Sequence, residues 1–114
     1  MTSIELPLFI HWEKTLGDIL SRTEKFPKRV RFTLSSRIDN LALDILEKII
    51  EARYVKDKSA ALAQASISLE KFRIFLRVSH EERYLDNKGF EHVARNIDSP
   101  VKSRFSSKNS FSSF

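Results

Sequence analysis

The sequence has no cysteine, two glycines, three prolines and no long hydrophobic run. The lack of cysteine excludes disulfides and thiolate metal sites. Two glycines are too few for a loop that cradles phosphates, and no Walker, dinucleotide, nucleophile-elbow or zinc motif occurs. No stretch approaches the roughly 20 apolar residues of a membrane span, and the N-terminus does not resemble a signal peptide. We therefore expect a soluble, cytoplasmic protein without a membrane partner.

The side chains most often used in catalysis and metal binding are scattered along the chain. His11, His80 and His92 fall in three different predicted helices, and none has a second histidine at helical spacing. Acidic residues such as Asp44 and Glu47 follow the polar side of one helix, as on a solvated face. We expect no catalytic residue, no metal and no cofactor, and hence no enzyme.

Positive charge is the main compositional signal. The 114 residues carry a net charge of +5, which suits nucleic acid first and an anionic membrane surface second. A solvated basic helix face explains the same count equally well. The length limits the chain to one domain with a modest core.

Apolar residues recur every three or four positions in four segments, which predicts an all-α protein. The expected helices span about 7–24, 28–53, 59–83 and 87–98. Pro7 suits the first turn of the first helix, although Thr2 and Glu5 could cap it one turn earlier. Asp57 or Ser59 is the expected cap of the third helix, and Asp86 that of the fourth.

The short connections between these segments predict an antiparallel, up-down-up-down four-helix bundle over residues 1–98, with a short fourth helix. A Ser/Phe-rich basic tail, 99–114, has no acidic residue and is expected to be disordered. Its phenylalanines and cations could contact bases and phosphates, or the tail could have no role.

Two helices carry more apolar surface than one compact chain can bury. The stripe around Ile38, Ala42 and Ile45 is expected to face the core. Further apolar residues lie on other faces, so either several helices surround these two or another subunit does. The predicted oligomer interface is Leu43, Leu46, Ile50, Tyr54, Ile67, Ile74 and Val78.

Cations gather where the helix dipole disfavours them. Lys28, Arg29, Arg31 and Arg37 occupy the first turns of the predicted 28–53 helix. Either an anion binds there with the help of free backbone N–H groups, or the side chains extend into water. A polar strip on the third helix, which includes Arg73 and Arg77, is either a ligand-facing ridge or a solvated seam.

Several segments together resemble the accessory variability determinant family of diversity-generating retroelements. They are Phe26-Pro27-Lys28, Arg31-Phe32-Thr33-Leu34, the run from Arg37 to Leu46, Ile50-Glu51-Ala52, Leu69-Glu70-Lys71-Phe72-Arg73 with Leu76-Arg77, and Phe90-Glu91-His92-Val93. The likeness covers roughly residues 10–97. One departure is that Asp98 is followed by Ser99-Pro100, where family members usually continue the fourth helix with a Gly- and Trp-containing apolar stretch.

This resemblance implies a four-helix bundle that assembles into a basic homopentamer, binds DNA and RNA, and docks on the reverse transcriptase of the retroelement. The enzyme copies template RNA with adenine-directed errors, and the accessory protein has no catalysis of its own. Carried over to this chain, the nucleic-acid contacts would be Lys28, Arg29, Arg31, Arg37, Arg73 and Arg77.

Two other interpretations stay open at the level of sequence. The related bundle of ribosomal-RNA intervening-sequence proteins shares the Phe-Pro-Lys region, but usually has an Asn-Ile-Ala-Glu-Gly-like run where this chain has Leu46 to Ala52. A helical adaptor, whose charge only keeps it soluble, would show no binding to nucleic acid.

Overall fold

Four α-helices and two short helical turns make up the described part of the protein. The structure is a computed structural model that describes residues 5–98. The elements are α1 (Glu5–Thr23), the 3-10 turn η1 (Lys28–Val30), the π turn η2 (Arg31–Ser35), α2 (Ser36–Ala52), α3 (Lys58–Glu81) and α4 (Asn87–Asp98). No strand occurs within 5–98, which confirms the all-α prediction. The tail from 99 to 114 lies outside the described residues.

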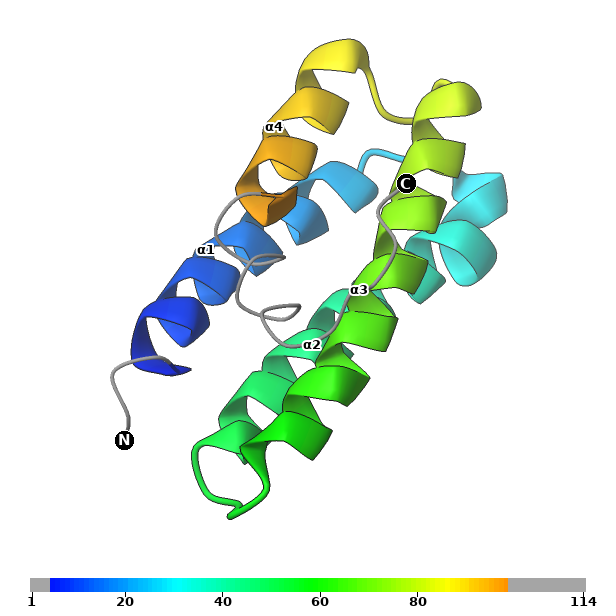
Figure 1. The fold of residues 1–114 in the computed structure, drawn as a ribbon. Coiled ribbons are helices and arrows are strands. Elements are labelled where there is room, and N and C mark those ends of the chain that lie inside the picture. The colour runs from blue at the N-terminus through cyan, green and yellow to red at the C-terminus, as the bar shows by residue number, and fades with distance from the viewer. Residues whose placement is uncertain (1–4, 99–114) are drawn as a thin grey trace.

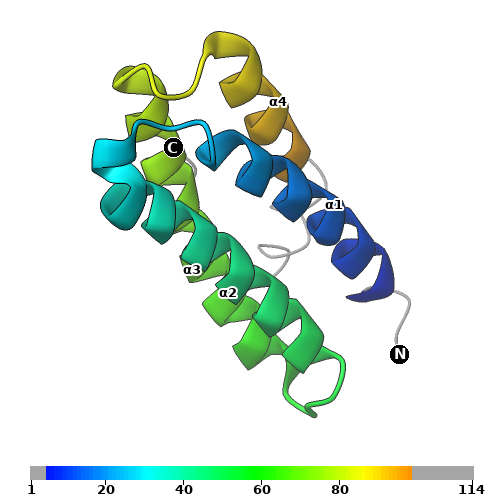
Figure 2. The same ribbon diagram turned by 180° about the vertical axis from the view of Figure 1, so that it is seen from behind.

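The helices are arranged as two neighbouring pairs (Figures 1 and 2). α2 and α3 lie side by side and make the most extensive contact between any two helices. α1 packs against α2, and α4 lies along α1 while also contacting α3. Away from the connection that joins them, α1 and α2 diverge.

The core follows the predicted apolar stripes. Ile38, Ala42, Ile45, Ile49 and Ala52 of α2 are all fully buried. They pack against buried residues of α3 and α1. Those of α3 are Ala65, Leu69, Phe72 and Leu76, and those of α1 are Leu8, Trp12, Leu16 and Ile19. Alanines alternate with large side chains in α2 and α3, which lets the two helices approach closely.

The single fully buried tryptophan joins α1 to α2. Trp12 Nε1–H donates a hydrogen bond of 2.9 Å to the carbonyl oxygen of Ala42. Its ring also meets Phe72 of α3 edge to face, with centroids 6.0 Å apart. Trp12 therefore contacts two other helices at once.

The prediction of one continuous helix from about 28 to 53 is wrong in its first two turns. Pro27 adopts φ −56° and ψ 146°, and the Val30 N–H bonds back to the Pro27 carbonyl to close a 3-10 turn. Val30 itself, at φ −109° and ψ 8°, leaves the helical path before the π turn begins. Regular α-helix starts only at Ser36, so the cations predicted for one helix are divided among three elements.

Short polar segments delimit α3 and α4. Asp57 is the cap of α3, since its side chain accepts the Ala60 N–H at 3.3 Å. α3 ends at Glu81, two residues before the predicted end, where Arg83 adopts a left-handed φ of 67° that a helix cannot continue through. Asp86 caps α4 as predicted, accepting the Gly89 N–H at 2.7 Å.

α4 is held against α1 by polar contacts along its length. His11 Nε2 lies 2.7 Å from the Asn96 carbonyl oxygen, and His92 Nε2 lies 3.7 Å from a carboxylate oxygen of Asp18. Near the start of α4, a Cβ added at Gly89 would lie 2.7 Å from an Arg22 nitrogen. Glycine at this position lets α4 approach α1 closely.

Candidate nucleic-acid and subunit interfaces

The predicted cations at the start of the second helical region are all exposed. Lys28 and Arg29 lie on η1, Arg31 on η2 and Arg37 in the first turn of α2. Within residues 5–98, no ion pair involves Lys28, Arg31 or Arg37. These four residues, called the basic turn from here on, concentrate positive charge that the described part of the chain leaves available.

The other two predicted cations, Arg73 and Arg77, lie on α3, on the flank opposite to Phe75. At 100° per residue, Arg73 and Arg77 lie roughly 40° and 80° from Leu69 on one side, while Phe75 lies roughly 120° away on the other. Phe75 shares a groove with Arg37, whereas the ring of His80, on the Arg77 side, stacks on Phe90 of α4 at 4.4 Å. The six predicted contacts therefore form two groups: the basic turn, and Arg73 with Arg77.

Environment also separates the two groups. Arg73 is half-buried, and both Arg73 and Arg77 already interact with other groups of the protein. Ser66, which helical spacing places on the same face of α3 as Arg73 and Arg77, is buried at 4% exposure. The strip is thus partly covered by the fold, and the basic turn is the stronger candidate for an anion.

The idea that free backbone N–H groups at the start of α2 bind an anion does not fit the local structure. The chain enters α2 directly from η2, and the Ser36 N–H already bonds to the Thr33 carbonyl. The first turn of α2 therefore lacks the open N-terminus that such a site requires. In the basic turn itself, the Val30 and Arg31 N–H groups already bond to the carbonyls of Pro27 and Lys28, so an anion there would be bound mainly by side chains.

An open groove adjoins the basic turn. Its volume is about 460 Å³. Its lining comes from the segment before α2 and the start of α2, and from α3 and the residues after it; the members are Val30, Phe32, Thr33, Leu34, Arg37, Phe75, Val78, Glu82 and Tyr84. Phe32 is 87% exposed, and the guanidinium of Arg29 lies 5.5 Å from the centre of the Tyr84 ring. The sequence prediction did not single out these aromatic residues, although Phe32 stands between two cations of the turn.

The predicted subunit contacts remain largely uncovered in the single chain. Leu43, Ile50 and Tyr54 are 40%, 36% and 76% exposed, and Ile67 and Ile74 are 50% and 38% exposed. Leu46 and Val78 are half-buried, since Leu46 packs against the core and Val78 lines the groove. An apolar surface of this kind is typical of a protein–protein contact.

The two sets of exposed apolar residues lie on different sides of the molecule. On α2, Leu43 and Ile50 lie roughly 140–160° from Ile45 by helical rotation, toward the same side as Asp39, which contacts α1. On α3, Ile67 and Ile74 lie roughly 140–160° from Leu69, facing away from the core. A ring in which one set meets the other set of a neighbour is compatible with this placement.

Asp39 bonds within its own chain. The Thr23 hydroxyl donates to Asp39 Oδ1 at 2.6 Å, which links α1 to α2. Burial raises the pKa of this carboxyl above its usual value, and the Thr23 hydrogen bond acts in the opposite direction. Both residues line a shallow hollow between α1 and the start of α2, together with Arg31 and the buried Ser35.

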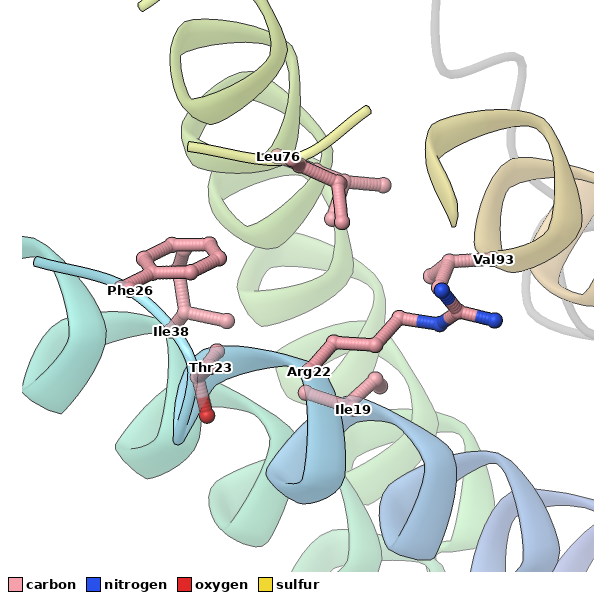
Figure 3. Close-up of a pocket in the computed structure, with 8 residues that line it drawn as sticks. Ile19, Arg22, Thr23, Phe26, Ile38, Leu76 and Val93 are labelled. Atoms are coloured by element: carbon pink, nitrogen blue, oxygen red, sulfur yellow. The ribbon is translucent and has the colours of Figure 1, made fainter. Parts of the chain in front are cut away.

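The hollow between α1, α3 and α4 is too small for a ligand. The hollow where α1, α3 and α4 meet measures about 10 Å³, and side chains such as Ile19, Leu76 and Val93 surround it (Figure 3). That is at most the volume of one water, and its walls are mainly apolar. Within the described residues, no three His, Asp or Glu side chains are placed to share a metal ion. No helix of this region has the length and apolarity that crossing a bilayer demands.

Comparison with known proteins connects these features to one family. The family model described as bAvd-like matches residues 10–99. No curated protein and no solved structure matches the chain. The family match covers most of the chain. It agrees with the resemblance of the sequence to the accessory variability determinants, and not with the intervening-sequence alternative. The chain therefore belongs to the bAvd-like family, the bacterial accessory variability determinants of diversity-generating retroelements.

Proposed function

We propose that this protein is a non-catalytic, nucleic-acid-binding accessory of a diversity-generating retroelement. It assists the reverse transcriptase of that element while template RNA is copied with errors. The basic turn is the observation that carries this proposal, because it presents four exposed cations on one local segment of an accessory variability determinant. Lysine and arginine side chains of this kind neutralise phosphates without reading sequence.

We further propose that the working form is a homo-oligomer, with a pentamer favoured, built from antiparallel up-down-up-down bundles. The pairing of His11 with Asn96 and of Asp18 with His92 supports opposite directions for α1 and α4. The exposed apolar residues of α2 and α3 support the oligomer, since each subunit has one set for each of two neighbours. A ring would also repeat the basic turn on every subunit, which raises the affinity for a long polyanion.

The reverse transcriptase and a cytoplasmic location belong to this proposal. A retroelement enzyme that copies RNA requires an accessory protein in the same compartment, and a positively charged oligomer could bind nucleic acid beside it. The proposed domain covers residues 1–98, followed by the basic tail 99–114, whose role is left to experiment.

Salt dependence tests the nucleic-acid part directly. The affinity of the full chain for a single strand and for a duplex would be measured by fluorescence anisotropy at several salt concentrations. If each cation of the basic turn neutralises one phosphate, the slope of log K against log salt should be about −2.8 for a single strand and about −3.6 for a duplex.

Alanine variants show which residues contribute to the salt slope. Arg31→Ala and Arg37→Ala should each weaken binding to all sequences alike and reduce the single-strand slope by about 0.7. The double variant Arg73→Ala with Arg77→Ala removes two cations of α3 that lie outside the basic turn. It should change the salt slope less than the loss of Arg31 and Arg37 does. An interaction that is absent or independent of salt would refute the nucleic-acid proposal and favour the helical adaptor.

A further inference from the structure

Phe32 is exposed to a degree that the fold does not require. It is 87% exposed, the highest value of any large apolar side chain in the described residues. Leu34, two residues later on the same turn, packs against the core and anchors the segment. Since Leu34 supplies that anchor, the ring of Phe32 contributes little to folding and is available to a ligand.

Two more aromatic rings accompany Phe32 in the groove. Phe75 of α3 and Tyr84, which follows α3, both line it and are both half-buried. Tyr84 is fixed by Phe26, whose buried ring lies 5.8 Å away, and by the Arg29 guanidinium at 5.5 Å. The groove is therefore a firm aromatic surface with one freely exposed ring at its edge.

The charges around the groove favour an anionic ligand. Arg37 lines the groove and forms no ion pair within residues 5–98. Glu82 is the one carboxylate that lines it in the described structure, so it offsets part of this charge. With Arg29 at the Tyr84 ring, the local balance stays positive.

A nucleotide whose base is not paired combines the two properties that this surface requires. Its base has a flat face that stacks on an aromatic ring, and its phosphate is attracted by arginine. In a duplex the base faces are already stacked on one another, and an exposed phenylalanine cannot reach them without unstacking. A volume of about 460 Å³ leaves room for a base and part of its sugar.

We propose that the groove beside the basic turn is a stacking site for unpaired nucleotides, with Phe32 as the ring that covers the base and Arg37 as its phosphate contact. This inference rests on the proposed nucleic-acid function and adds a preference for single-stranded over duplex segments. The inference assigns part of the affinity to Phe32, an uncharged side chain. The salt slope reports only phosphate contacts, so it would not reveal this contribution.

The test compares the binding of the parent protein with that of variants at Phe32 that keep or lose the aromatic ring. Labelled oligothymidylate of about 16 nucleotides, the upper range for one single-strand site, and a duplex of equal length serve as probes. Phe32→Leu and Phe32→Ala should weaken single-strand binding about 5- to 150-fold, the loss of one stacked base, and duplex binding less than about 2-fold. Phe32→Tyr should bind like the parent protein.

The salt slope and a control variant complete the experiment. Phe32→Leu should leave the slope unchanged, because no phosphate contact is lost, whereas Arg37→Ala should reduce it. Ile10→Ala removes an exposed apolar side chain of α1 that does not line the groove, and it should not change the affinity for either probe.

The outcomes separate the two proposals. If the parent protein binds neither probe, the proposed function fails. If it binds both and Phe32→Leu binds them as well as the parent, the proposed function stands and the stacking site is wrong. If Phe32→Leu instead lowers the sedimentation mass while helicity is unchanged, the ring is a subunit contact and the stacking site is again refuted.

Discussion

Replacing Trp12 with phenylalanine tests how α1 is held to the rest of the core. The Trp12 side chain is fully buried, donates one hydrogen bond to the Ala42 carbonyl and contacts Phe72 edge to face. Phenylalanine keeps an aromatic six-membered ring and loses the N–H and part of the volume. The variant therefore removes one bond and creates one small cavity, without placing a new polar group in the core.

The magnitude follows from three contributions. The lost hydrogen bond costs about 1 kcal/mol, because the Ala42 carbonyl lies inside α2 and keeps its helical partner. A cavity of roughly 40 Å³, at about 24 cal/mol per Å³, adds about 1 kcal/mol. The lost transfer free energy of the removed carbons adds about 1 kcal/mol more. We expect Trp12→Phe to lower the free energy of unfolding by about 2–4 kcal/mol.

Urea denaturation followed by circular dichroism measures this change. Tryptophan fluorescence cannot follow the variant, since Trp12 is the only tryptophan. With a slope near 1.5 kcal/mol per molar urea, the midpoint should fall by about 2 M. Both proteins are compared at one concentration, because the proposed subunit association would make stability depend on concentration.

Ile10→Ala on the same helix is the control. Ile10 is 45% exposed, and its truncation should cost about 0.5 kcal/mol or less. If Trp12→Phe loses less than about 1 kcal/mol with an unchanged slope, the assignment of Trp12 as the link between α1 and the other helices is wrong.

Two further predictions concern the half-buried Asp39 carboxyl and the proposed subunit contacts. Because burial raises the pKa of Asp39, the unfolded chain releases this proton first as pH rises, and stability falls between the unfolded and the folded pKa. Asp39→Asn keeps an acceptor for Thr23 and should remove that fall in urea titrations from pH 4 to 7, whereas Thr23→Val should deepen it; identical pH profiles for all three proteins would contradict this account. Leu43→Glu should reduce the sedimentation mass toward the 13.3 kDa of one chain while changing monomer stability by about 0.5 kcal/mol or less. Should Leu43→Glu unfold the chain instead, Leu43 belongs to the core.

The positions of the α-helices and their core-facing stripes could be predicted because both depend on local sequence. Ile38, Ala42, Ile45 and Ile49 recur at helical spacing, and that spacing alone places them on one face that must be buried. The caps at Asp57 and Asp86 were predictable for the same reason, since each accepts a backbone N–H three residues ahead.

The segment from 28 to 35 could not be predicted in this way. Its residues are compatible with a helix, and Pro27 suits a helix start, so the pattern gave no sign of a 3-10 turn followed by a π turn. That winding depends on how Phe26 and Leu34 reach the core from a chain that leaves Pro27 in an extended conformation.

The candidate site shows the same division between sequence and structure. The sequence by itself determined which residues are cationic, which apolar residues exceed the needs of one core, and which family the chain resembles. Only the tertiary structure decided that Arg73 and Arg77 lie on another flank from the basic turn, and that Phe32, Phe75 and Tyr84 share a groove. The physical reason is distance along the chain: residues within one helix are related by a fixed rotation, whereas residues 50 positions apart meet only through the packing of whole helices.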